Sequence, residues 1–222
     1  MKKLVANIGL WLAGMLGYLL GSGFLAAGSQ LSARPDIPAE ILPTMITVFG
    51  IFGLLYLTAL SYLHWKRVYD KTKIQIELPK PWMANILFPL GLFVLLIVVQ
   101  MFLPIPPSNN QEVVIQNVLA QPFFSFFAVV IFAPIMEELL FRGLFAGYFF
   151  PNLTQKTGLV LYFLLTSTLF SLAHGPRTIP HFLIYFTMGA SLCWLYLAKR
   201  DLRYSVGLHA ANNLLSFVLI FL

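Results

Sequence analysis

The sequence predicts an all-α protein that crosses a membrane several times. Hydrophobic residues make up 59% of its 222 positions, charged residues only 10%, and the mean hydropathy is +0.83. These values are typical of polytopic membrane proteins, because a water-soluble domain carries far more polar surface. The apolar residues also gather in runs of about 20, the length that spans ~30 Å of hydrocarbon as a helix.

Seven such runs predict about seven transmembrane helices, most of them separated by stretches that contain Pro, Gly or Asn. The predicted spans are residues 4–28, 42–64, 83–105, 121–149, 158–175, 179–198 and 203–222. No internal repeat divides the chain. We therefore expect one integral membrane domain, with an N-terminal three-helix region at residues 1–119 and a four-helix core at residues 120–222.

The first run follows Lys2 and Lys3, an arrangement that cleaved signal peptides share. Its apolar stretch extends from Leu4 to about Gly28, well beyond the ~7–15 residues of a signal-peptide core. We therefore expect a retained transmembrane helix. Because the sequence is short and shows no targeting extension, we expect a bacterial cytoplasmic membrane.

Basic residues predict how the helices are oriented. Eleven of the 14 Lys and Arg residues fall on one side of the predicted membrane, two fall on the other, and Arg142 lies within a span. The positive-inside rule then places the N-terminus in the cytoplasm and the C-terminus outside. The pair on the outer side is Arg34 and Arg177. The larger group comprises Lys2, Lys3, Lys66, Arg67, Lys71, Lys73, Lys80, Lys156, Lys199, Arg200 and Arg203.

The same distribution argues against a nucleic-acid partner. The net charge is +6, but the basic residues lie at the ends of apolar runs, where they determine topology, and not on one compact face. The bilayer is the expected environment instead. The single cysteine, Cys193, excludes an intrachain disulfide and a Cys-rich zinc site.

Three charges lie inside the apolar run at residues 121–149. A charge at mid-bilayer costs at least ~2.5–3.5 kcal/mol, so such residues usually face a protein interior or a cavity and mark function. Glu138 and Arg142 are i,i+4 neighbours on a helix and can form an ion pair. Glu137 is displaced by ~100° from Glu138, which leaves it available to hold a water molecule or take a proton. Pro134 removes a backbone hydrogen bond and predicts a kink nearby.

Two polar clusters follow in later spans. His174 lies four residues after Phe170, and His209 lies four residues before Asn213, with Asn212 as the i+3 alternative. An imidazole beside a carboxamide can stabilise a developing oxyanion. Two histidines and a glutamate, here His174, His209 and Glu137, could equally bind a metal such as zinc, so a divalent metal and no cofactor both stay open.

The three clusters are at compatible depths. At ~1.5 Å per residue, Glu137, His174 and His209 lie roughly 20, 24 and 14 Å from the helix ends on the Lys- and Arg-rich side. Helix tilt can absorb this spread. We therefore expect the three side chains to converge on one cavity open to the cytoplasmic half. His64 is expected to lie at the membrane interface, and His181 is expected to have a structural role.

Taken singly, each cluster has a structural interpretation. Glu138 and Arg142 can serve as a buried ion pair that holds helices together, and an intramembrane histidine or asparagine can hydrogen-bond a neighbouring helix. The recurrence of three clusters at similar depth on separate helices favours a catalytic site.

These clusters resemble the motifs EExxxR, FxxxH and HxxxN of the CPBP family of intramembrane endopeptidases, the CAAX proteases and bacteriocin-processing (Abi) enzymes. The motif residues here are Glu137, Glu138, Arg142, Phe170, His174, His209 and Asn213. The resemblance covers about residues 120–220 and makes that region the catalytic core. It implies a peptidase in which the first glutamate activates water and the histidines and asparagine form the oxyanion site. The metalloprotease motif HExxH is absent.

The sequence thus predicts an intramembrane endopeptidase acting on a membrane-associated or peptide substrate. Glu137 is the expected general base, Glu138 and Arg142 orient it, and Phe170 packs the site or lines the substrate path. Two alternatives use the same residues. One is a catalytically silent membrane scaffold or immunity protein. The other is a small proton-coupled transporter with Glu137 and His174 as a relay, although the sequence has no repeat symmetry or paired broken helices.

Overall fold

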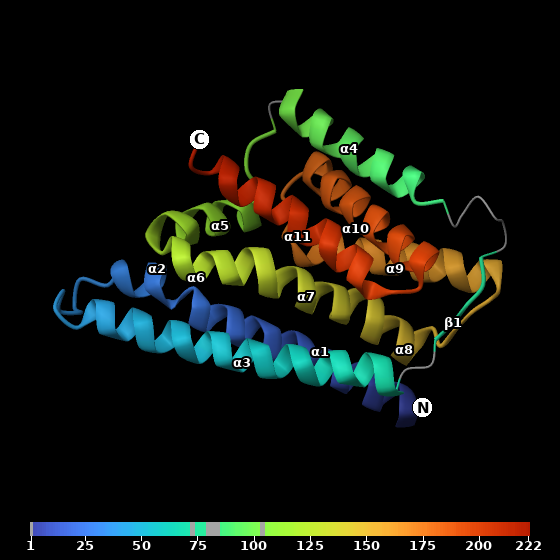
Figure 1. Ribbon diagram of the computed structural model, residues 1–222, viewed down its shortest axis with the longest axis horizontal. Helices are drawn as coiled ribbons and strands as arrows, with labels where there is room; N and C mark the ends of the chain where they lie inside the picture. Colours follow the sequence, from blue (N-terminus) through green and yellow to red (C-terminus); the bar gives the residue numbers. More distant parts are fainter. Residues whose placement is uncertain (1, 72–73, 79–84, 103–104) are drawn as a thin grey trace.

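The computed structural model describes residues 2–71, 74–78, 85–102 and 105–222 (Figure 1). Lys73 and Lys80, two of the basic residues counted above, lie outside the described residues, as do the ends of the predicted span 83–105. The chain is helical almost throughout, and its two termini lie at opposite ends of the bundle.

Helices occupy all seven predicted regions. The long helices are α1 (Lys2–Leu25), α3 (Leu42–Lys71), α4 (Leu87–Phe102), a helix composed of several segments from Pro122 to Phe149, α9 (Lys156–Ala173), α10 (Ile179–Lys199) and α11 (Leu202–Leu219). Two shorter helices, α2 (Ala27–Ser32) and α5 (Asn109–Ala120), lie in the predicted connections.

Five of these helices are long and apolar enough to cross a membrane, namely α1, Leu42–Asp70 of α3, Pro122–Phe149, α9 and α10. The apolar part of α4, Leu87–Gln100, is shorter. The 18-residue helix α11 is not among the five, and it carries His209, Asn212 and Asn213. An all-α polytopic membrane fold is therefore confirmed.

The helix Pro122–Phe149, called the central helix below, is the core of the bundle. In its most apolar window 56% of the residues are buried, against 11% in α1. On one side it contacts α1 and α3, which pack against each other, and on the other it contacts α9 and α11. Helix α10 packs between α9, α4 and α11. The third helix, α4, thus packs on the C-terminal helices, and the proposed division at residue 119 stays a prediction.

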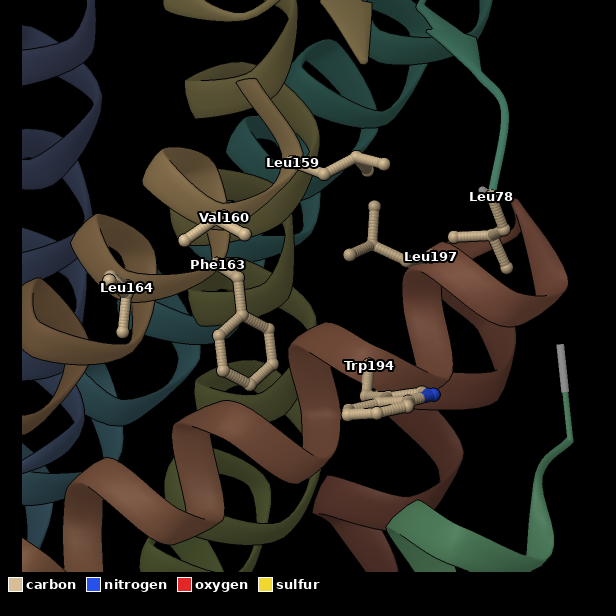
Figure 2. A pocket seen from close by; sticks show the side chains of 7 residues that line it. All are labelled: Leu78, Leu159, Val160, Phe163, Leu164, Trp194 and Leu197. Carbon is tan, nitrogen blue, oxygen red and sulfur yellow. The ribbon is translucent and has the colours of Figure 1, made fainter. Parts of the chain in front are cut away.

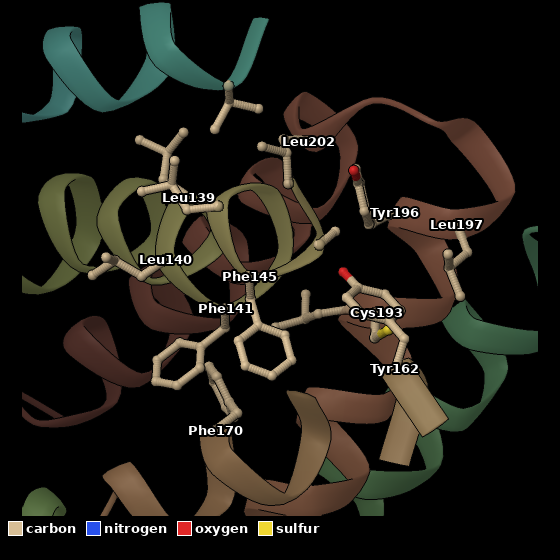
Figure 3. Packing of buried hydrophobic residues seen from close by; sticks show 14 of the residues in the cluster. Leu139, Leu140, Phe141, Phe145, Tyr162, Phe170, Cys193, Tyr196, Leu197 and Leu202 are labelled. Atoms are coloured by element: carbon tan, nitrogen blue, oxygen red, sulfur yellow. The ribbon is translucent and has the colours of Figure 1, made fainter. Parts of the chain in front are cut away.

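Apolar packing is densest around the second half of the central helix. Figure 3 shows side chains from this segment meeting others from α9, α10 and α11, and all of those labelled are buried. They are Leu139, Leu140, Phe141, Phe145, Tyr162, Phe170, Cys193, Tyr196, Leu197 and Leu202. This packing fixes the helix that carries the three intramembrane charges.

The central helix is α-helical only in part. The segments α6 (Pro122–Phe126), α7 (Ala133–Glu138) and α8 (Phe145–Phe149) alternate with two π-helical segments, η2 (Phe127–Phe132) and η3 (Leu139–Leu144). In η2 the N–H of Ala133 donates to the carbonyl of Ala128, five residues back. Segments of this kind are often found at functional sites. Glu137 and Glu138 are the last two residues of α7, the α-helical segment between η2 and η3.

Side chains from other helices bond to the carbonyls of η3. The indole Nε1 of Trp11 donates to the Leu140 carbonyl at 2.9 Å, Thr166 Oγ1 donates to Phe141 at 2.5 Å, and Tyr162 Oη donates to Arg142 at 3.1 Å. These bonds join α1 and α9 to the backbone of the central helix, because a π-helical segment has irregular carbonyl pairing that neighbours can complete.

A pair of two-residue strands closes one end of the bundle. Strand β1 (Gln75–Ile76) pairs in parallel with β2 (Asn152–Leu153), with Gln75 opposite Asn152. The segment after α3 is thereby held against the connection that leads into α9.

A small cavity of about 170 Å³ lies between α9, α10 and Leu78 (Figure 2). Only apolar and aromatic side chains line it, namely Leu78, Leu159, Val160, Phe163, Leu164, Trp194 and Leu197. None of the predicted site residues is among them, so this cavity is not the candidate active site.

Candidate active site

The structure brings the three polar clusters together. Glu137 ends α7 with Glu138, His174 directly follows α9, and His209 lies within α11. Glu137 Oε2 lies 3.7 Å from His174 Nε2 and 3.8 Å from His209 Nε2. Because the side chains of Glu137 and His174 are 13% and 12% exposed, the cluster is partly accessible. Access from the cytoplasmic half stays a prediction.

Glu138 and Arg142 form the ion pair that their spacing predicted. Arg142 Nη1 donates to Glu138 Oε1 at 2.9 Å, and both side chains are fully buried. Arg142 Nη2 also donates to the carbonyl of Gly189 in α10 at 3.0 Å. A buried charge needs such partners to offset its desolvation. Glu138 is thus held in place, whereas Glu137 has no contact with the arginine among the ion pairs of the described residues.

Phe170 packs against residues of all three clusters. Its fully buried ring lies 4.5 Å from the Arg142 guanidinium carbon, and its centre is 4.4 Å from the His174 ring and 5.7 Å from the His209 ring. The same ring therefore contacts members of all three clusters. Of the two roles expected for Phe170, this burial favours packing over a place on the substrate path.

The ring hydrogens of both histidines can be assigned from their partners. His174 Nδ1 lies 2.7 Å from the Phe170 carbonyl oxygen, which only accepts, so this nitrogen carries the hydrogen. His209 Nδ1 lies 3.2 Å from Glu138 Oε1, which accepts in the same way. With Nδ1 as the donor, each ring turns Nε2 toward Glu137 Oε2, a buried oxygen with no hydrogen-bond partner among the described residues.

Asn213 has a backbone partner. Its Nδ2 donates to the Val129 carbonyl at 2.9 Å, and Asn212 Nδ2 donates to Asn213 Oδ1 at 3.2 Å. In a π-helix, the N–H of residue 134 would donate to the carbonyl of Val129, five residues earlier. Since Pro134 has no N–H, the asparagine supplies the missing donor. One N–H of the Asn213 amide stays available for another acceptor.

Sequence reasoning missed Tyr18. Its hydroxyl, in α1, donates to Glu137 Oε1 at 3.0 Å, so the two carboxylate oxygens of Glu137 face different partners. Because a tyrosine hydroxyl in an apolar span needs a polar partner, the position of Tyr18 in the first span already indicated a contact with a polar group. Nothing in the sequence identified which partner it would be.

The other two histidines lie away from this cluster. His181 Nε2 lies 2.9 Å from the Pro106 carbonyl, a contact that fits the structural role expected for it. His64 lies within α3, which continues to Lys71, so it is not at a helix end. Its position at the membrane interface stays a prediction. Helix α3 extends beyond the apolar run that predicted it, because residues after that run, many of them polar, continue the helix.

Metal binding can be tested on the donors present. His174 and His209 each hold Nδ1 on a backbone carbonyl or a carboxylate, as zinc-binding histidines do. However, in the described part of the chain no three His, Cys, Asp or Glu side chains are grouped so that they could hold one metal ion. Metal binding therefore stays a prediction, and the proposed reaction uses only side chains of this protein.

Comparisons with known proteins find similarity to membrane proteases. Residues 119–215 match the family described as type II CAAX prenyl endopeptidase Rce1-like. The chain is 28% identical over 195 residues to the membrane-embedded CAAX protease MroQ of Staphylococcus aureus (strain USA300), covering 82% of this chain and 76% of that protein. It is 26% identical over 113 residues to YdiL of Bacillus subtilis (strain 168), a candidate membrane peptidase, covering 51% of this chain and 43% of that protein.

No solved structure matches the chain. The matched region contains the whole set of motif residues, from Glu137 to Asn213, but not Tyr18. With the buried ion pair and the converging histidines, these similarities support the resemblance of residues 119–215 to the CPBP family, which includes CAAX-type proteases.

Proposed function

We propose that this protein is an intramembrane endopeptidase in which Glu137 activates water. The observation that carries the proposal is the meeting of Glu137 Oε2 with two histidine Nε2 atoms at 3.7 and 3.8 Å. A general base must lie within reach of the proton that it removes, directly or through one water. Three acceptor atoms around one point suit a water molecule, which has two hydrogens to donate.

The reaction would proceed through a tetrahedral intermediate. As the water oxygen bonds to the scissile carbonyl carbon, its proton passes to Glu137. When the carbon–nitrogen bond breaks, the same proton passes to the leaving amine. Glu138 and Arg142 keep this glutamate and His209 in place. The second N–H of Asn213 is available to the oxyanion.

The histidines have a protonation requirement in this scheme. While His174 and His209 keep their Nδ1 partners, either ring donates to an oxyanion at Nε2 only when it carries two protons. In the neutral form the same nitrogens accept hydrogen bonds from water and would hold the attacking water. A ring that stabilises the oxyanion would have to take its second proton from solvent before the reaction begins, because the proton of the attacking water goes to Glu137 and then to the leaving amine.

The substrate class is part of the proposal. The matched family and the Staphylococcus relative are named for CAAX cleavage, so the carboxyl-terminal segment of a membrane-associated protein is the first class to test. The distribution of basic residues supports an orientation with the N-terminus inside, and the two bacterial relatives support a bacterial cytoplasmic membrane as the location. Cleavage in the cytoplasmic half of that membrane is part of the same proposal.

The experiment compares membranes from cells that express the wild type, Glu137→Gln or Glu112→Gln. Glu112 is a matched control because its carboxylate lies in an exposed ion pair with Arg177. New peptide ends are identified by mass spectrometry after labelling of free termini. We expect the wild type and Glu112→Gln to produce the same new ends and Glu137→Gln to produce none. Identical ends in all three samples would refute the proposal, and a Glu137-dependent proton flux in liposomes without cleavage would favour the transporter.

A further inference from the structure

A second cavity lies apart from the candidate active site, between α1, α3 and α8. Its volume is about 550 Å³, within the ~300–1,000 Å³ range of small-molecule sites. Its lining comes from the middle of α1, the second half of α3 and one residue of α8. The lining residues are Leu10, Ala13, Gly14, Leu60, Leu63, His64, Lys66, Arg67 and Tyr148.

The lining is divided into an apolar and a cationic part. Leu10, Leu60 and Leu63 lie toward the middle of their helices, whereas Lys66 and Arg67 come from the last two turns of α3. Along α3 the polarity therefore changes within about one helical turn. A ligand that fills the cavity must combine an apolar part with an anionic one.

No acidic side chain among the described residues forms an ion pair with Lys66 or Arg67. Within the same part of the chain, Asp70, one turn further along α3, is exposed and unpaired as well. The guanidinium carbon of Arg67 lies 5.3 Å from the centre of the Tyr148 ring. This cation–π contact orients the group but adds no negative charge.

The inner wall depends on a close helix approach. A Cβ on Gly14 would lie 2.8 Å from His64 Nε2 and 2.9 Å from Leu140 Cδ2, so a larger residue there would have to displace these side chains. His64 Nδ1 is bonded to the Leu60 carbonyl at 2.9 Å, which turns Nε2 toward α1. A hydrogen bond of 2.8 Å from Asn7 Nδ2 to the Tyr148 carbonyl joins α1 to α8 beside the cavity.

We propose that this cavity binds an anionic phospholipid, with its phosphate at Lys66 and Arg67 and the start of an acyl chain against the leucines. Basic pockets between transmembrane helices bind such headgroups, and each Lys or Arg near an anionic surface contributes ~1 kcal/mol. Leu10 and Leu63 are exposed, so the apolar part opens toward the bilayer and a lipid can enter sideways. A free phosphate would leave that part unfilled.

The test is lipid retention by the purified full chain in native mass spectrometry, after equilibration with equal amounts of phosphatidylglycerol and phosphatidylcholine. Two variants address the two halves of the cavity. Lys66→Gln with Arg67→Gln removes the charge, and Ala13→Leu fills the apolar part from an exposed position. Lys199→Gln is the matched control, because Lys199 also lies over a tyrosine ring at a helix end, 5.2 Å from the centre of Tyr204, but does not line the cavity.

We expect the wild type and Lys199→Gln to retain phosphatidylglycerol in preference to phosphatidylcholine. The double variant should lose about thirtyfold of this preference, or about fivefold for each charge removed, and Ala13→Leu should lose retention of the lipid. Equal retention of the two lipids by the wild type would overturn the proposal. So would a preference that survives in both variants, or inorganic phosphate that raises the melting temperature as much as phosphatidylglycerol does.

Discussion

Tyr18 and Glu137 are 119 positions apart in the chain and share a hydrogen bond of 3.0 Å. The tyrosine hydroxyl occupies Oε1, and Oε2 is left facing the two histidines. Tyr18 lies in α1, outside the region that matches the family. The first helix thus positions the carboxylate of a site whose other residues all belong to the C-terminal half.

This contact predicts the effect of Tyr18→Phe. Hydrogen bonds to charged groups contribute about 1.5–3 kcal/mol, so loss of the contact should slow cleavage about tenfold or more if the fixed carboxylate is needed. Since Glu137 is partly exposed, water can replace the hydroxyl, and the melting temperature should change little. Tyr62→Phe, which removes an exposed hydroxyl of α3, is the control. Equal cleavage by both variants would show that the hydrogen bond has no catalytic role.

The two adjacent glutamates should respond differently to amidation. Glu137→Gln should abolish cleavage and leave expression and thermal stability nearly unchanged, because it removes a charge that is desolvated at some cost. Glu138→Gln leaves Arg142 buried without its charged partner, so it should lower stability by about 3–5 kcal/mol as well as activity. Unfolding and peptide cleavage measured on both purified variants decide between these assignments. An active Glu137→Gln beside a stable, inactive Glu138→Gln would reverse them.

Asn213 and Pro134 should be coupled energetically. Asn213→Ala leaves the Val129 carbonyl without its donor, at a cost of about 1 kcal/mol. In a Pro134→Ala background the backbone N–H of residue 134 becomes available, and the same substitution should cost less. A double-mutant cycle on thermal unfolding measures this coupling. The same loss in both backgrounds would mean that the asparagine does not substitute for the missing N–H.

Asp201 predicts a pH dependence of stability outside the membrane-spanning segments. Its carboxylate accepts hydrogen bonds from Arg203 and from Tyr69 Oη, and the bond from Arg203 is the main cause that lowers its pKa. A pKa that is lower in the folded state gives stability that is present above the unfolded value of ~3.9 and is lost as the pH falls through the folded value.

The measurement is the melting temperature of wild type and Asp201→Asn at neutral pH and below pH ~3.9. We expect the wild type to be more stable at neutral pH and the difference to shrink in acid. Asp36→Asn is the control, because Asp36 forms a fully exposed pair with Arg34 and should have little effect at either pH. A difference for Asp201→Asn that does not change with pH would contradict the assignment to its charge.

The distribution of basic residues predicts the location of the C-terminus. A reporter fused after Leu222 should be active only on the extracytoplasmic side. The two termini lie at opposite ends of the bundle (Figure 1). Activity in the cytoplasm would mean that one predicted span does not cross. The helices to examine first would be α4 and α11, because neither is among the five helices that are long and apolar enough to cross a membrane.

Sequence periodicity predicted contacts within one helix better than contacts between helices. The i,i+4 spacing was enough for the pair between Glu138 and Arg142 and for placing His174 beside Phe170. It could not supply Tyr18, because the pairing of α1 with the central helix depends on packing over the whole bundle. Asn213 was expected to face the reaction centre, but one of its N–H groups bonds to Val129, a contact that exists only because the helix there is π-helical.

Other features were missed for local reasons. The strands β1 and β2 have two residues each, too few for an alternating pattern. Helix α5 was also missed, although its sequence contains a start signal, the capping box formed by Ser108 and Gln111. That signal was obscured by the apolar runs on either side.

The positions of Tyr18 and His209 have a consequence for biogenesis. Domains generally fold from the N-terminus first during synthesis, so α1 is made long before α11. Tyr18 reaches Glu137 from one of these helices and His209 reaches it from the other. A nascent chain that stops before Leu202 lacks one of the two groups that meet at Glu137 Oε2. An immature protein in the translocon would therefore have an incomplete site, and if the proposed function holds it could not cleave a neighbouring protein before its own synthesis is finished.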